Sequence, residues 1–160
     1  MALFQEMEDK RLGHNIVIYS ILIDGLCNAE KVIIAREFFD SLPTKGLLPN
    51  VPTYNIMIKG LCQEGLIDEA CELLETMDGN GCSPNDRTYN KIIQGLLQHN
   101  ETSKATKYLQ IMVDKGFSGD VTTASMLVDM LSSNQVDKKI QEFLLEFVCF
   151  IICQDQGQLS

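Results

Sequence analysis

The feature of this sequence that most constrains its fold is an internal repeat with a period of 35 residues. The clearest unit spans residues 51–85, and residues 16–50 and 86–120 repeat it in register. A fixed period of this length is typical of helical solenoids, in which one unit cannot bury its apolar face alone and stacks on its neighbours. The in-phase residues are Tyr19, Tyr54 and Tyr89; Gly25, Gly60 and Gly95; Ala35, Ala70 and Ala105; and Gly46, Gly81 and Gly116.

Each repeat carries two stretches of apolar residues at helical spacing. In the central unit Tyr54, Ile58 and Leu61 share one face of a first helix, and Ala70 and Leu74 share one face of a second. A glycine follows each second helix, at the place where a left-handed residue ends a helix without strain. We therefore predict an all-α fold, a right-handed α-solenoid of 35-residue helix–turn–helix repeats.

The pattern is incomplete at both ends of the chain. Leu3, Phe4 and Met7 match the second half of a repeat, so we expect a lone second helix there. Either a longer protein has been cut at this point or that helix caps the array. The expected divisions are a partial repeat at 1–15, complete repeats at 16–50, 51–85 and 86–120, a degenerate capping repeat at 121–153 and a tail at 154–160.

The apolar stretch near the C-terminus, residues 144–153, bears on whether the chain crosses a membrane. It is too short to span a bilayer, which needs roughly 20 apolar residues. We expect it to form the last helix of the capping repeat and expect no membrane association.

Net charge and cysteine content limit the classes of function. The net charge is −9 and the isoelectric point is near 4.6, which argues against a general polyanion binder with a basic surface. The first residues lack the basic start and apolar run of a secretory signal. Cys27 and Cys62 occupy the same place in successive repeats, so we interpret them as buried small hydrophobic residues. A disulfide between repeats is the less favoured alternative in a reducing compartment.

The sequence offers no convincing site for catalysis or for a metal. His14 lies in a predicted loop and His99 at a predicted helix end, each away from a nucleophile that it could activate. Cys149 and Cys153 are four residues apart, but no histidine or further cysteine nearby completes a zinc site. We expect no enzymatic activity, no metal and no cofactor.

These repeats resemble those of pentatricopeptide repeat (PPR) proteins of the plain 35-residue kind, and in particular plant organellar proteins similar to fertility restorers. The resemblance covers about residues 3–140 and rests on the in-phase tyrosine, glycine, alanine and proline. It implies that each repeat binds one base of single-stranded RNA. Helical repeats that read one base each are a known mode of RNA recognition.

The resemblance also implies which residues read the bases: the residue after the repeat tyrosine and the last residue of the repeat. Asparagine, serine and aspartate differ in donors and acceptors, so pairs of them can distinguish base edges. We expect the residues after the tyrosines to face outward from the first helices. An ordinary structural role is the alternative: the residues after the tyrosines would only begin a helix, and the last residues of the repeats would only cap one. By position, the pairs are Ser20 with Asn50 (adenine), Asn55 with Asn85 (cytosine or uracil) and Asn90 with Asp120 (uracil), and Ser125 stands alone in the fourth repeat.

A further position, two residues before the tyrosine, packs against the base in such proteins. Here it holds Val17, Pro52 and Arg87. A lysine that can meet the RNA backbone is common at the end of the first helix, but this chain has Asn28, Gln63 and Gln98 there. Because fewer phosphate contacts weaken binding, we expect the isolated chain to bind RNA poorly. Acidic residues of the second repeat, such as Glu69 and Glu75, are interpreted as a solvated outer face.

The leading hypothesis is therefore a monomeric module that binds single-stranded RNA sequence-specifically in organellar RNA processing or stability. The resemblance favours the mitochondrion, with the chloroplast as the second choice. A scaffold for protein partners is the alternative, since helical repeats offer grooves for a partner helix. A truncated fragment without activity is the other. A basic stripe along the helix starts would favour RNA, and an acidic face with an apolar groove would favour protein.

Overall fold

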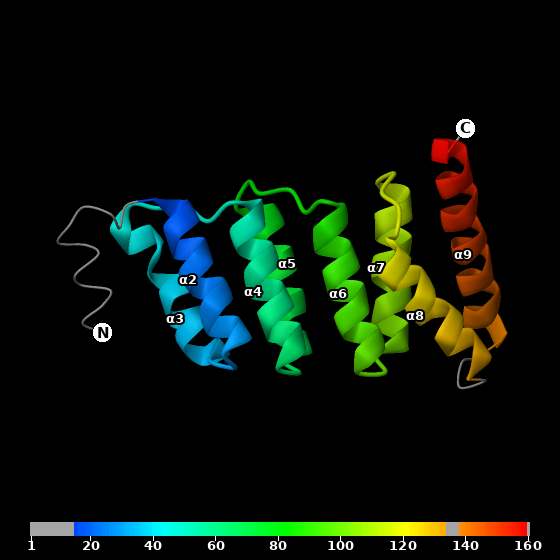
Figure 1. The fold of residues 1–160 in the computed structure, drawn as a ribbon, viewed down its shortest axis with the longest axis horizontal. Coiled ribbons are helices and arrows are strands. Elements are labelled where there is room, and N and C mark those ends of the chain that lie inside the picture. Colours follow the sequence, from blue (N-terminus) through cyan, green and yellow to red (C-terminus); the bar gives the residue numbers. More distant parts are fainter. Residues whose placement is uncertain (1–14, 134–137, 160) are drawn as a thin grey trace. The chain divides into compact units, whose positions relative to one another are not determined.

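The computed structural model describes residues 15–133 and 138–159, with side chains described as far as residue 150. The partial repeat expected at 1–15 lies outside the described residues except for Asn15, and so does His14. Within the described residues all regular structure is helical (Figure 1). The helices are α2 (Ile16–Asn28), α3 (Val32–Ser41), α4 (Val51–Gln63), α5 (Ile67–Gly79), α6 (Asp86–Gln98), α7 (Thr102–Asp114), α8 (Val121–Ser132) and α9 (Lys138–Leu159), with a 3-10 turn η1 at Pro43–Lys45.

The N-terminal unit, which ends at Pro84, contains two helical hairpins. Helix α2 packs against α3 and α4, and α4 packs against α5. The predicted first-helix and second-helix stripes form its core, where Ile23, Ala35, Met57, Ile58 and Ala70 are completely buried. Two repeats thus stack in this unit as the 35-residue period predicted.

The C-terminal unit begins at Asn85 and contains helices α6 to α9. Helix α6 packs against α7 and α8, and α8 packs against α9. Its core contains the third-repeat residues Ile93, Ala105 and Leu109 together with Leu127 and Leu144 of the degenerate repeat. Helix α9 continues through Leu159, beyond residue 153, where the expected fourth repeat ends.

Left-handed residues end the helices with the same period as the core. Gly46, Gly81 and Gly116 follow the second helices with φ of 75°, 83° and 82°. Helix ends of this kind favour glycine because it has no Cβ to clash. A second left-handed position, at the turn between the paired helices, holds Gly65 at φ 80° but Glu30 at 62° and Asn100 at 60° in the neighbouring repeats.

The acidic residues expected on an outer face are exposed. Helix α5 carries no basic residue, and its five carboxylates all lie in solvent: Asp68, Glu69, Glu72, Glu75 and Asp78. Among the described residues, no helix combines the length and apolar character needed to cross a bilayer. No group of three or more His, Cys, Asp or Glu side chains in the same part of the chain is arranged to hold a metal ion.

Candidate nucleic-acid interface

The last residue of each complete repeat caps the first helix of the next one. Asn50 Oδ1 accepts hydrogen bonds from Thr53 N at 3.0 Å and from Thr53 Oγ1 at 2.6 Å. Asp120 Oδ1 accepts from Thr123 N at 2.8 Å. Asn85 Oδ1 accepts from the backbone of Thr88 at 3.0 Å, and the Thr88 hydroxyl accepts from Asn85 N, which completes a capping box. All three side chains therefore have the structural role of a cap, and Asn50 and Asp120 remain exposed.

The predicted base-reading pair of the first repeat is joined through a residue of the second. Ser20 Oγ lies 2.8 Å from Thr53 Oγ1, and that hydroxyl also contacts Asn50 Oδ1. Ser20 Oγ in addition donates to Ile16 O at 2.8 Å. The structure thus brings Ser20 and Asn50 into contact with one threonine hydroxyl, although they are far apart in the sequence.

The pair of the third repeat is joined in a similar way. Asn90 Oδ1 accepts from Asp120 N at 3.0 Å and from Thr123 Oγ1 at 2.7 Å. Asn90 Nδ2 donates to Asp86 O at 2.8 Å and to Ser118 O at 3.3 Å. A primary amide has two donor hydrogens and two acceptor lone pairs, so Asn90 uses its full capacity within the protein.

This arrangement corrects the expectation that the residues after the tyrosines face outward. Ser20 is 9% exposed and Asn90 is 4% exposed, because the first turn of the following repeat covers each of them. The covering threonines were missed in the sequence reasoning. Their signal was present in the period, since Thr53, Thr88 and Thr123 are in phase and each precedes the tyrosine position.

The other predicted contact residues are more accessible. Ser125 is exposed on α8, and Asn55 is half-buried on α4. The three predicted base-packing side chains are exposed: Val17, Pro52 and Arg87. Asn28, Gln63 and Gln98 are also exposed, at or near the ends of the first helices, as placed from the sequence.

Charge on the first helices is balanced. Three basic side chains and three acidic ones lie on α2, α4, α6 and α8, so these helices form no basic stripe. This distribution fits the expectation of weak binding to the RNA backbone. The charged residues are Lys59, Arg87 and Lys91, and Asp24, Asp86 and Asp129.

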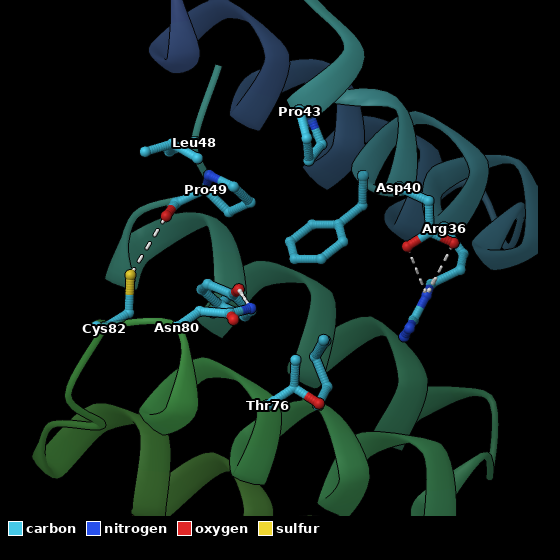
Figure 2. A pocket seen from close by; sticks show the side chains of 12 residues that line it. Arg36, Asp40, Pro43, Leu48, Pro49, Thr76, Asn80 and Cys82 are labelled. Carbon is cyan, nitrogen blue, oxygen red and sulfur yellow. Dashed lines mark hydrogen bonds and ion pairs between the residues drawn. The ribbon is translucent and has the colours of Figure 1, made fainter. Parts of the chain in front are cut away.

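An open groove of about 620 Å³ in the N-terminal unit contains none of the predicted base-contacting residues. It lies among α3, η1, the start of α4 and the end of α5 (Figure 2). Arg36 pairs with Asp40 at 3.3 Å along one side, and Asn80 Nδ2 donates to Tyr54 Oη at 3.2 Å on another. Leu48 is 80% exposed at its rim, so the groove offers apolar surface with few free polar groups.

Comparison with known proteins gives the family. The pattern of the PPR repeat family matches residues 14–63, 49–96 and 87–133. The chain belongs to the PPR repeat family. The matched segments contain all the complete repeats and the first helix of the degenerate one, which confirms the resemblance to PPR repeats noted from the sequence.

Solved PPR structures confirm the fold. The crystal structure of the PPR protein PPR10 from maize has a TM-score of 0.71 and 23% identity, and it covers 90% of this chain. The structure of PPR10 in complex with an 18-nt psaJ RNA element has a TM-score of 0.75 and 22% identity over 94% of this chain. The chain spans about a fifth of PPR10, with 21% and 22% of those chains covered. This likeness shows an all-α helical-repeat solenoid. No curated protein sequence in the comparison matches the chain.

Proposed function

We propose that this chain binds single-stranded RNA through its PPR repeats, one base per repeat. The observation that carries the proposal is the convergence of two predicted reading pairs, Ser20 with Asn50 and Asn90 with Asp120, each on one threonine of the following repeat. Membership of the PPR repeat family supports it. So does the fold shared with PPR10, a protein crystallised in complex with RNA.

The exposed members of the pairs offer the groups that a base edge needs. Asn50 uses Oδ1 to cap α4, and within the described residues its Nδ2 has no recorded partner, so this donor can meet an acceptor on a base. The Asp120 carboxylate accepts from Gln94 Nε2 at 3.1 and 3.3 Å and keeps lone pairs for a donor. Ser20 and Asn90 would contact a base only by exchanging hydrogen bonds that they make within the protein.

In this proposal the three complete repeats read 5′-A-(C/U)-U-3′, with the first repeat nearest the 5′ end. The RNA would be one that is processed or stabilised in an organelle, with the mitochondrion as the first choice and the chloroplast as the second. The module needs neither catalysis nor a cofactor for this role, because it acts by sequence-specific binding alone.

A base switch tests the proposal. With residues 16–120 grafted into the middle of a longer PPR array, Asn90→Ser leaves Asp120 in place and creates a pair that resembles guanine-reading repeats. We expect the preferred base at the third position to move from U towards G, by about 1–3 kcal/mol as for other well-formed base contacts. Binding to RNAs with each base at that position, measured by fluorescence anisotropy, provides the readout.

The neighbouring repeat supplies the matched control. Asn55→Ser should alter the preference at the second position and leave the third unchanged. If Asn90→Ser leaves the array with the same affinity for all four bases as the parent, Asn90 is a structural residue only and the RNA-reading role fails for this repeat.

A scaffold for a protein partner is the second candidate, and the groove beside Leu48 favours it. Phe39 and Tyr54 are among the residues that line that groove, which could take an apolar side chain of a partner helix. The paired Arg36 and Asp40 leave little free charge there. Family membership and the reading pairs favour RNA over this alternative.

A further inference from the structure

Two fully buried threonines, Thr53 and Thr123, each contact both members of one reading pair. Thr53 and Thr123 are each 0% exposed. A buried hydroxyl without a partner destabilises the fold, so each must bond to its surroundings. Both find their partners across the repeat boundary, 33 residues earlier, in the residue that follows the repeat tyrosine.

The single hydroxyl proton of Thr53 couples the two reading residues of the first repeat, because only one of them can accept it at a time. Its hydroxyl carries one proton but contacts both Asn50 Oδ1 and Ser20 Oγ. Ser20 likewise has one proton for Ile16 O and Thr53 Oγ1. A base that changes the hydrogen bond of Ser20 therefore changes the proton available to Asn50, and the pair responds as one unit.

Thr123, the equivalent threonine of the degenerate repeat, makes three hydrogen bonds at the third reading pair. Thr123 Oγ1 donates to Asn90 Oδ1 at 2.7 Å and accepts from Gln94 Nε2 at 3.0 Å. The Thr123 backbone N–H donates to Asp120. One threonine of the degenerate repeat thus contacts both reading residues of the repeat before it.

The chain contains an internal comparison at the first repeat, where Ile18 replaces the threonine. There the cap Asn15 accepts from Val17 N at 2.9 Å instead of from the third helical residue. Its backbone ψ is 122°, whereas the caps that precede a threonine have ψ of 177° at Asn50 and 177° at Asp120. The cap geometry therefore differs where the threonine is absent.

We propose that Thr53 and Thr123 are positioning residues for base reading, each orienting the reading pair of the repeat before its own. A reading unit then consists of three side chains from two successive repeats. The degenerate repeat supports this view, because it lacks the repeat tyrosine at Ala124 yet keeps Thr123 for the third repeat. The inference rests on the proposed RNA-binding function.

The test uses the full chain, extended at its N-terminus in the same register by PPR repeats of known base preference. Thr53→Val keeps the shape of the side chain and removes the hydroxyl. We expect it to reduce discrimination at the first base by roughly three- to tenfold, the range for one lost hydrogen bond, and to leave the third base unaffected. Thr123→Val should do the reverse. Thr53→Ser and Thr123→Ser, which restore a hydroxyl, should recover most of the discrimination.

Thr106→Val is the matched control, because among the described residues the Thr106 hydroxyl bonds Thr102 O on the same helix, α7, and none of the reading residues. It should leave both positions unchanged. A Thr53→Val protein that melts like the parent and keeps its first-base discrimination would overturn the proposal. So would an equal loss at both positions, since a general structural role predicts that result.

A measurement without RNA separates this proposal from the proposed function. The Thr123 hydroxyl holds Asn90 Oδ1, and this orientation directs the Asn90 Nδ2 hydrogens to Asp86 O and Ser118 O. These hydrogens should therefore be protected from exchange in the full chain, and the loss of orientation in Thr123→Val but not in Thr123→Ser should reduce their protection, as seen by NMR. If the parent array shows no base discrimination, the RNA function fails, and this exchange result alone decides whether the threonine orients Asn90. Unchanged protection in Thr123→Val overturns the positioning role.

Discussion

Cys27 and Cys62 occupy the same position in successive repeats, and both are buried thiols with a raised pKa. Both are buried in the first helices, at 6% and 5% exposure, as the sequence predicted for small hydrophobic residues. Burial raises the pKa of the Cys27 thiol to about 11, with a further increase from Asp24. Burial also raises the pKa of the Cys62 thiol to about 12, assisted by Cys71. Both are free thiols in this structure.

These pKa values predict a loss of stability at alkaline pH. Below about pH 8.5, the usual pKa of a thiol, both the folded and the unfolded chain keep the protons. As the pH rises from there towards 11 or 12, the unfolded chain ionises while the folded chain resists, so the free energy of unfolding falls. Urea denaturation at pH 8 and pH 10.5 should show a smaller decline for Cys62→Ala than for the parent, which controls for lysines and tyrosines that titrate in the same range.

Thiol labelling offers a direct test of the same burial. At pH 8, iodoacetamide should modify the exposed Cys149 much faster than Cys62, because the thiolate is the reactive form. Mass spectrometry of peptides reads the result, and in denaturant the two rates should converge. Equal rates in the folded chain would show that Cys62 is accessible.

At the scale of the helices, Gly60 marks a close approach between α2 and α4. A Cβ added at Gly60 would lie 2.9 Å from Cys27 Cβ and nearer still to its Sγ. At Gly25, the equivalent position one repeat earlier, a Cβ would meet none of the described residues within 4 Å. Among the described residues, the in-phase glycine is therefore required for packing in the second repeat but not in the first.

Gly60→Ala and Gly25→Ala form a matched pair that measures this contact. Both gain the same helix propensity, about 1 kcal/mol, but only Gly60→Ala overpacks the interface. We expect Gly25→Ala to be the more stable of the two by about 1–3 kcal/mol, the usual cost of overpacking, in urea denaturation.

The double variant Cys27→Ala with Gly60→Ala should recover part of that difference, because it removes the sulfur that the new methyl group meets. Equal stabilities for the two single variants would contradict the close contact between α2 and α4 at Gly60 and Cys27.

At the scale of the whole molecule, charge limits the affinity that the proposed RNA binding can reach. The chain has a net charge of −9, and α5 alone carries five carboxylates and no basic side chain. The first helices have as many acidic as basic residues. In the proposed function, affinity for RNA would therefore come from base contacts and stacking more than from attraction to phosphates.

This charge distribution predicts weak and nearly salt-independent binding. For the chain alone, the logarithm of the binding constant should fall with the logarithm of the salt concentration with a slope of about −1 or shallower. In the extended array, Arg87→Gln should lower affinity, because we propose that this exposed guanidinium stacks on a base. Arg36→Gln is the control: its side chain pairs with Asp40 in the groove and should not affect RNA.

Fluorescence anisotropy over a salt series gives both results. A steep slope would show many phosphate contacts and contradict the balanced charge of the first helices. A loss of RNA affinity in Arg36→Gln but not in Arg87→Gln would place the RNA in the groove.

The sequence by itself determined the repeat, the helices and the core of this protein. A period of 35 residues and helical apolar spacing specify which faces are buried, as Ala35, Ala70 and Ala105 confirm. The glycine-terminated second helices also follow from local chemistry, since a left-handed residue favours glycine at Gly46 and Gly81. Such features depend on neighbours within one repeat, and a periodic sequence displays them directly.

Only the tertiary structure decided how the predicted reading residues are oriented. Ser20 and Asn90 look like solvent-facing polar residues within their own helices, but both are buried because Thr53 and Thr123 cover them from the next repeat. The different roles of Gly25 and Gly60 were hidden for the same reason. A contact between repeats depends on side chains more than thirty residues apart, and helical periodicity along one segment contains no information about which of them meet.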